Sequence, residues 1–254
     1  MAKSERVDVM ERGDIYFAYR PKIDVETPKG IDDVQRFYMI LKPREADRYR
    51  MVVFGQKKLP EVEGSGERYW AFVDKVSRKV DDVTRELGAE QYETKTRGER
   101  TRPAARPAGE GVYALVRHGD HTHLAYALEL PAEGSDVQRE LNIRDEGSYI
   151  ISVKNPQTPS PRGMGLGEHE EAEFPKRLQE RFRNRRFINV DPPEFLNHEG
   201  AELLFVGAAA DVSDELGITL DAERETEDTA EVFSDLELDR QEHPTAPLLK
   251  GEWA

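Results

Sequence analysis

The stretch IYFAYRP at residues 15–21 decides the fold, because a similar stretch, VYALVRH, returns at residues 112–118. Both runs are rich in aromatic and β-branched residues, which is typical of β-strands. Tyrosine stands second and arginine sixth in each run, and a glycine (Gly13 or Gly111) lies just upstream. The similarity predicts that the chain contains two related halves.

Two further pairs of strand-like runs follow in the same order. Residues 37–43 align with residues 125–131, and residues 49–53 align with residues 149–153. A segment with helical character follows each third run. In residues 69–87 apolar side chains recur at spacings of three and four, and a second helix is expected to begin near Pro175. The order predicts an α+β fold of two related β-β-β-α halves, an internal duplication, with a largely antiparallel sheet.

Charge and composition divide the chain into four parts. The predicted halves span residues 11–88 and 111–210, and they are joined by a basic, flexible connector at residues 89–110. Residues 211–254 form an acidic tail with 14 acidic and three basic residues, so they carry −11 of the total charge of −14. We expect the tail to be partly ordered at most, with one short amphipathic element that contains Val232, Phe233, Leu236 and Leu238.

The composition of the 254 residues excludes several classes of protein. The chain has no cysteine, which excludes disulfides, thiol catalysis and cysteine-ligated metal sites. Its longest apolar run, residues 203–210, is far shorter than the roughly 18 residues of a membrane span. The charged N-terminus lacks the apolar core of a signal peptide. We therefore predict a soluble, cytoplasmic protein with no membrane association.

The hairpin-like segment from Arg117 to His123 suggests two kinds of enzyme. Residues 115–119 (LVRHG) resemble the opening motif of the histidine phosphatase superfamily. This resemblance implies phosphotransfer, with His118 as the residue that accepts the phosphoryl group and Arg117 as a phosphate ligand.

The same residues also suggest a metal site. A two-residue turn at Gly119 and Asp120 would place His118 opposite His121, with His123 on the same face. Three imidazoles and a water are a typical ligand set of catalytic zinc, so a metal-dependent hydrolase is a second enzymatic hypothesis. The alternative is that the three histidines face solvent at an ordinary turn.

The predicted second helix is strongly basic. Residues 176–186 contain six basic residues and one acidic residue. We expect an anion-facing surface made of Arg177, Arg181, Arg185 and Arg186, because such helices supply phosphate contacts in nucleic-acid binding. Tyr92 and Tyr113 are candidates for stacking on bases. The acidic tail is a competing partner for this helix, in the same chain or in a second copy.

The sequence thus favours binding over catalysis. It contains no Walker A motif, no strand-linked GxGxxG and no HExxH. We predict a non-enzymatic interaction protein that associates through its basic helix and acidic tail, with no cofactor. A protein partner or self-association is favoured over nucleic acid. The alternative is a zinc-dependent hydrolase or phosphotransfer enzyme centred on Arg117, His118, His121 and His123.

Overall fold

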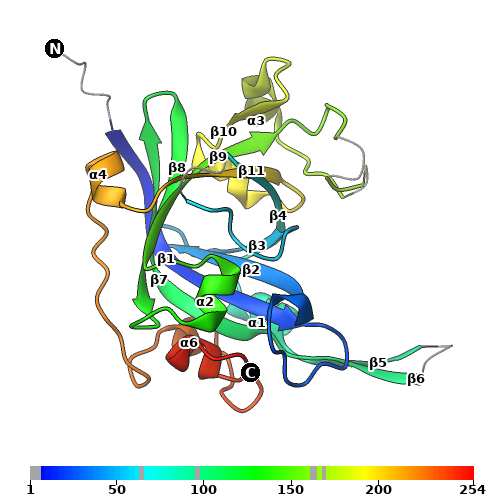
Figure 1. Ribbon diagram of the computed structural model, residues 1–254. Coiled ribbons are helices and arrows are strands. Elements are labelled where there is room, and N and C mark those ends of the chain that lie inside the picture. Colours follow the sequence, from blue (N-terminus) through cyan, green and yellow to red (C-terminus); the bar gives the residue numbers. More distant parts are fainter. Residues whose placement is uncertain (1–6, 63–65, 95–97, 161–164, 168–169) are drawn as a thin grey trace.

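The described part of the chain folds around a closed, eight-stranded antiparallel β-barrel (Figure 1). The computed structural model describes residues 7–62, 66–94, 98–160, 165–167 and 170–254. Around the barrel the strands follow the order β1 (Val7–Pro21), β2 (Val34–Pro43), β3 (Tyr49–Phe54), β4 (Arg68–Ser77), β11 (Glu202–Ala209), β9 (Glu146–Lys154), β8 (His121–Leu130) and β7 (Arg106–His118). Strand β7 pairs with β1 and closes the barrel.

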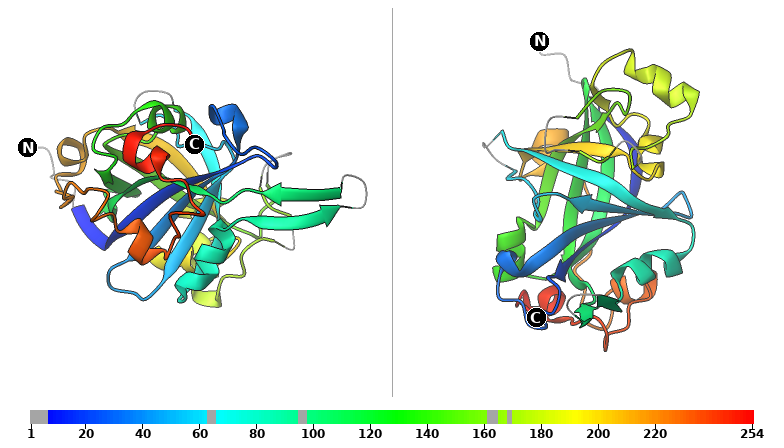
Figure 2. Two further views of the ribbon diagram at one scale, coloured as in Figure 1. Left: turned by 90° about the horizontal axis from the view of Figure 1, so that it is seen from below. Right: turned by 90° about the vertical axis from the view of Figure 1, so that its right-hand side faces the viewer.

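The other elements are short. The strand β10 (Phe187–Asn189) adds to β9, and β5 (Glu90–Thr94) with β6 (Gly98–Arg102) forms a two-stranded arm that projects from the body (Figure 2). Among the described residues no helix has the length and apolar character needed to cross a membrane. The helices are α1 (Val80–Leu87), α2 (Asp136–Leu141), α3 (Lys176–Gln179), α4 (Val212–Leu216), α5 (Val232–Asp235) and α6 (Ala246–Lys250), with 3-10 turns η1 (Ile31–Asp33), η2 (Glu180–Phe182) and η3 (Pro193–Asn197).

The prediction of an α+β fold with β-β-β-α halves is therefore wrong. The expected helix at residues 69–87 is strand β4 followed by the two-turn helix α1. Within β4, Ala71 and Val73 point into the barrel core, whereas Phe72 packs on an outer cluster. A strand with apolar residues on both faces can imitate the three-and-four spacing of a helix, and its β-branched residues favour the strand.

The expected second helix is also much shorter than predicted. It consists of α3 and η2, and the backbone turns at Arg183 and Asn184, both of which have positive φ. Two successive residues at positive φ end a helix, because left-handed φ/ψ values cannot continue the right-handed helical path and its i→i−4 hydrogen bonds. This turn brings Arg185 back toward the barrel wall, where β10 begins.

The segment at 89–110 is not a free basic connector. It contains the β5–β6 arm and the beginning of β7, and Arg100 and Arg102 form ion pairs with Asp24 and Glu90. Arg106 is buried and donates hydrogen bonds to the backbone carbonyls of Ala104 and Glu26.

Six aromatic rings fill the barrel. Neighbouring ring centroids lie between 4.9 and 6.3 Å apart, and each ring comes from a different strand. This aromatic belt consists of Phe17, Phe37, Phe54, Phe205, Tyr149 and Tyr126, in this order around the barrel. All six side chains are buried. Because the belt closes on itself, the barrel has a packed core at this level.

The three aligned pairs of runs are all strands, but their side chains do not correspond. Tyr16 packs on the outer face of the barrel wall and its aligned residue Tyr113 points inward. Tyr38 likewise packs on the outer face, whereas its aligned residue Tyr126 points inward. The same holds for Met51 and Ile151 in the third pair of runs. Successive residues of a strand alternate between faces, so aligned residues on opposite faces occupy different environments. The aligned runs therefore give no support to an internal duplication into two related β-β-β-α halves.

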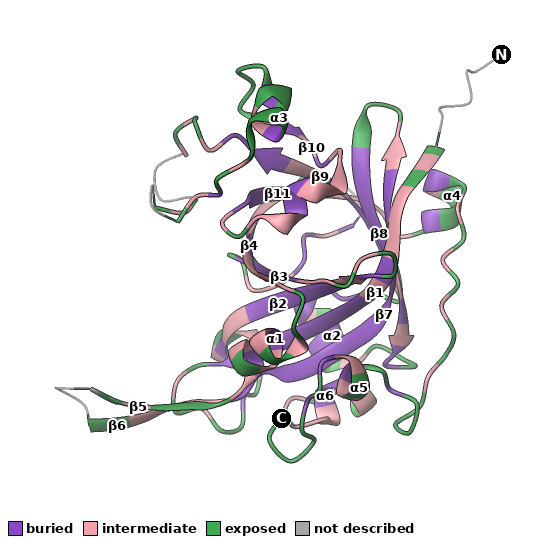
Figure 3. Cartoon of the chain, turned by 180° about the vertical axis from the view of Figure 1, so that it is seen from behind, coloured by how far each residue is buried: buried purple, intermediate pink, exposed green. Residues whose placement is uncertain are grey.

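The acidic tail is ordered and wraps the outside of the barrel. Val212 and Leu216 cover β7 and β8, and farther along the chain Val232, Leu236 and Leu248 cover the outer faces of β1 to β3. Figure 3 shows α4, α5 and α6 along the outside of the barrel. The expected docking of an amphipathic element around Val232 is confirmed, and the expectation that the tail is at most partly ordered is wrong.

Carboxyl groups fasten the tail to the barrel. The Glu110 carboxylate of β7 is fully buried and accepts hydrogen bonds from the backbone N–H groups of Glu231 and Val232 at the start of α5, at 3.2 and 2.9 Å. Burial and a hydrogen bond to Glu225 raise the pKa of Glu110 to about 9. Nearby, Asp235 accepts hydrogen bonds from Tyr16 and Lys42. The Glu110–Glu225 contact thus needs a proton.

The first prediction concerns the packing of the tail. Leu236→Ala is expected to lower the free energy of unfolding by about 2–4 kcal/mol, because it removes a buried side chain from the outer cluster. Asp228→Ala, at an exposed position of the same tail, is the control and is expected to change stability by less than about 0.5 kcal/mol. Urea unfolding measures both, and equal, small effects would contradict the docked tail.

The second prediction concerns pH. The pKa of Glu110 rises from 4.5 to about 9 on folding. Between pH 4.5 and pH 9 the Glu110 carboxyl group is therefore protonated in the folded state and ionised in the unfolded state. The stability from this group is present below pH 4.5 and is lost as the pH rises toward 9. The melting temperature of the wild type is expected to fall by several degrees between pH 6 and pH 9, and that of Glu110→Gln by less. Glu133→Gln, at an exposed acidic position, should show the same fall in melting temperature as the wild type. If Glu110→Gln also shows the same fall, the protonated Glu110–Glu225 contact is refuted.

Candidate functional site

Strand β9 changes its neighbour along one edge. Its residues 146–150 pair with β8, and its residues 152–154 pair with β10. Strand β8 begins at His121, but its pairing with β9 begins only at His123. The tip of the β7–β8 hairpin therefore separates from the barrel wall at the point where β10 takes its place on β9.

A pocket of about 470 Å³ lies at this separation, and we call it the seam pocket. The side-chain amide of Asn189 donates a hydrogen bond to the backbone carbonyl of Asp120, which ties β10 to the hairpin tip. The pocket is lined by Asp120, His121, Ser152, Arg181, Arg185, Phe187, Ile188, Asn189 and Asp191. It joins residues from the two segments that the sequence singled out separately, the histidine hairpin and the basic helix.

Local packing positions Arg181 and Arg185, the two arginines that line the seam pocket. Leu178 and Phe182 are buried and anchor α3 and η2 on the barrel, so that Arg181 is left on the exposed side. The turn at residues 183–184 then places Arg185 beside β10. The guanidinium of Arg181 donates to the backbone carbonyl of Asp191 at 3.2 Å. Arg185 donates to the backbone carbonyl of Phe182 at 3.5 Å.

The two arginines of the seam pocket form no ion pair with a described carboxylate. Asp191 is paired with Arg117 at 3.0 Å, and Asp120 lies 3.2 Å from the Nε2 atom of His121. Among the described residues, no carboxylate oxygen lies within 4.0 Å of the guanidinium nitrogens of Arg181 or Arg185. Two guanidinium groups without a carboxylate partner among the described residues thus lie at a concave surface.

The other predicted arginines have different places. Arg177 forms a bidentate ion pair with Glu194, which neutralises it. Arg186 is exposed but does not line the seam pocket. Arg117 binds the carboxylates of both Asp8 and Asp191, so its guanidinium is already engaged. The structure therefore brings together two of the four residues that we expected to form an anion-facing surface.

The histidines lie on one face of the hairpin, as predicted. His118 is directly opposite His121, and the ring centroids of His118 and His123 are 5.8 Å apart. His123 is buried, with its Nδ1 atom 3.0 Å from the Ser148 hydroxyl. Burial and the two neighbouring histidines lower the pKa of His123 to about 4.

Potential metal ligands converge elsewhere. Among the described residues, three ligand atoms lie within 4.8 Å of one another only at Asp14, Glu231 and Asp235. The ammonium group of Lys42 is bonded to Asp235 and lies 4.0 Å from Asp14, so a cation already compensates these carboxylates. The zinc-dependent hydrolase and phosphotransfer hypotheses remain predictions of the sequence.

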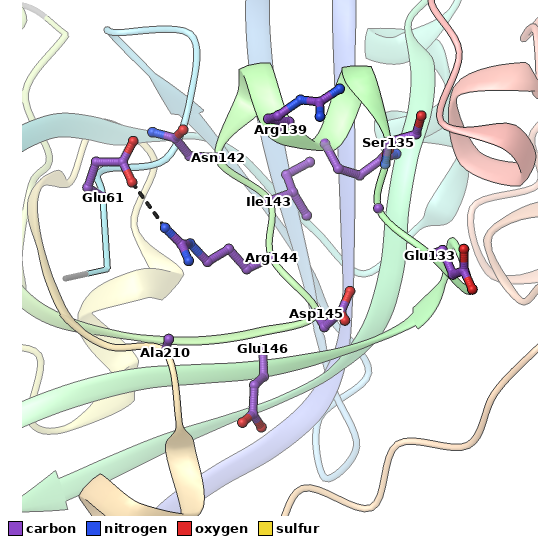
Figure 4. A pocket seen from close by; sticks show the side chains of 12 residues that line it. Glu61, Glu133, Ser135, Arg139, Asn142, Ile143, Arg144, Asp145, Glu146 and Ala210 are labelled. Carbon is purple, nitrogen blue, oxygen red and sulfur yellow. Dashed lines mark hydrogen bonds and ion pairs between the residues drawn. The ribbon is translucent and has the colours of Figure 1, made fainter.

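A larger pocket of about 740 Å³ lies beside α2 (Figure 4). Its two arginines are both compensated, since Arg144 pairs with Glu61 at 3.4 Å and Arg139 pairs with Asp136. The remaining charged groups of its lining are carboxylates, Glu133, Asp145 and Glu146. This pocket offers no uncompensated cation, unlike the seam pocket.

The sequence did not identify the residues of β10 as part of a site. Phe187, Ile188 and Asn189 form a short apolar run that resembles any core segment. Their role depends on where β9 leaves β8, and no local pattern encodes this point. Tyr113, a predicted stacking residue, is buried inside the barrel.

Comparison with known proteins leaves the site to be interpreted from its geometry. No protein-family model, no curated protein and no solved structure matches the chain.

The third prediction concerns zinc. Untagged protein that has been incubated with zinc and desalted is expected to retain no stoichiometric zinc, because His123 would have to leave its buried position beside Ser148. Elemental analysis measures the content. One zinc ion per chain that is lost in His121→Ala/His123→Ala would contradict this expectation and favour the hydrolase.

Proposed function

We propose that the chain is a non-enzymatic binding protein that holds an anionic group of its partner in the seam pocket. The observation that carries this proposal is the pair of guanidinium groups, Arg181 and Arg185, that face the pocket without a carboxylate partner among the described residues. Guanidinium groups bind phosphate and carboxylate oxygens through parallel, charge-assisted hydrogen bonds.

The distribution of charge supports the same proposal. The net charge of −14 would repel an anion if the acidic residues surrounded the pocket. The acidic tail begins at α4, where Glu215 lies 3.7 Å from His123 of the β7–β8 hairpin, and then runs along the barrel to α5 and α6, at the end of the molecule remote from α3 and β10 (Figures 1 and 3). Among the described residues, no carboxylate of the tail forms an ion pair with Arg181 or Arg185.

The anionic group is the defining feature of the partner. An acidic protein segment, the tail of a second copy and a nucleic acid all provide one. The sequence predicted a cytoplasmic protein with a protein partner favoured over nucleic acid; the proposal keeps the cytoplasmic location and requires of the partner only the anionic group.

The fourth prediction tests this function with inorganic tripolyphosphate as the probe. The wild type is expected to bind it at low salt, and Arg181→Gln/Arg185→Gln to bind it at least tenfold more weakly, because both pocket cations are lost. Raising the salt concentration should weaken binding to the wild type. Isothermal titration calorimetry measures both effects.

The control variant changes the net charge equally at other places. Lys176→Gln/Arg139→Gln removes one cation from α3 and one from the pocket beside α2, and neither residue lines the seam pocket. It is expected to bind tripolyphosphate within about twofold of the wild type, since only screened, long-range attraction changes. If both double variants lose affinity equally, or if the wild type does not bind, the seam pocket is not an anion site.

A further inference from the structure

Two aromatic side chains meet on the outer face of the barrel beside the seam pocket. The ring of Phe187 from β10 and the ring of Trp70 from β4 are in edge-to-face contact, with centroids 5.7 Å apart and an interplanar angle of 69°. They reach each other across β9 and β11, which lie between their strands. Both side chains are only partly buried, so a ligand can contact them.

A second hollow continues the surface beyond the rings. This pocket of about 270 Å³ is lined in part by Trp70, Phe72, Gln56, Arg68 and Glu202, whose carboxylate is paired with Lys154 at 2.6 Å. Arg68 is exposed, and no carboxylate oxygen of the described residues lies within 4.0 Å of its guanidinium. The two hollows and the ring pair between them thus carry three arginines, Arg181, Arg185 and Arg68, and two aromatic rings.

We propose that the ligand of this surface is a single-stranded nucleic acid. In this arrangement, Phe187 and Trp70 stack on bases, while Arg181 and Arg185 on one side and Arg68 on the other contact phosphates. Alternation of aromatic rings and basic groups along a β-surface is what binding of single strands requires, because every base has a π-face and every nucleotide a negative charge.

The inference rests on the proposed function, since the phosphates occupy the same seam pocket. An acidic peptide would need only the arginines, and the partly buried ring pair between them favours bases. The distance across three neighbouring strand spacings is about 14 Å, which corresponds to four steps of about 3.4 Å, or about five stacked nucleotides. About five nucleotides lies within the range for β-barrel proteins that bind single strands.

The native tryptophans allow a direct experiment. The chain has two tryptophans, and Trp253 packs against Tyr19 near the C-terminus, away from the seam pocket. Trp253→Phe therefore leaves Trp70 as the only tryptophan. Titration of this variant with a twelve-residue oligothymidylate at low salt is expected to quench Trp70 fluorescence to saturation, because a stacked base quenches the indole it contacts. Unchanged Trp70 fluorescence would overturn the stacking of a base on this residue.

Affinities for two probes separate this inference from the proposed function. Phe187→Leu keeps all charges and is expected to weaken oligothymidylate binding about tenfold while tripolyphosphate binding stays within about twofold. Arg181→Gln/Arg185→Gln should weaken both. Binding of tripolyphosphate without tighter binding of the oligonucleotide, or equal oligonucleotide affinity of Phe187→Leu and wild type, would refute the nucleic-acid ligand and leave anion binding intact. If the wild type binds neither tripolyphosphate nor the oligothymidylate, both proposals are refuted.

Discussion

The aromatic belt is the constraint on which the rest of the structure depends. Eight strands enclose a space just wide enough for side chains, and here six rings from six strands fill it. A barrel that is filled in this way has no internal space for a ligand at the level of the belt. Recognition must therefore take place on the outer surface or at the ends. Much of the outer surface is covered in turn, because the tail packs on the outer faces of β1 to β3 and of β7 and β8.

The seam pocket exists because the barrel is closed by strands of unequal length. Strand β9 extends beyond its pairing with β8, and its remaining backbone groups would be unpaired at the barrel wall without another neighbour. Strand β10 supplies that neighbour for residues 152–154. Because β10 enters from α3 and η2, the same event that completes the hydrogen bonds of β9 brings Arg181 and Arg185 next to the hairpin tip. The strand that completes the hydrogen bonds of β9 thus also forms a wall of the pocket that contains Arg181 and Arg185.

The sequence predicted local features well and their assembly poorly. The strand-like runs at residues 15–21 and 112–118 are strands, and the turn at Gly119 and Asp120 does place His118 opposite His121. These features depend on neighbours in the chain. The helix predicted at residues 69–87 failed because β4 is apolar on both faces, and its partners lie far away in the sequence. Likewise, Arg181 and Arg185 were recognised by their charge, but the contributions of Phe187 and Trp70 depend on four strands that only the closed barrel brings together.

The central claim is that an anion binds in the seam pocket, where the neighbour of β9 changes from β8 to β10. Nuclear magnetic resonance of protein labelled with ¹⁵N locates this directly, by following the side-chain Nε–Hε signals of the arginines during a titration with tripolyphosphate. The account predicts that the signals of Arg181 and Arg185 shift together with the backbone amides of residues 120–122 and 187–189, while those of Arg139 and Arg144 stay in place. Shifts centred on Arg139 and Arg144, or spread evenly over all exposed arginines, would contradict it.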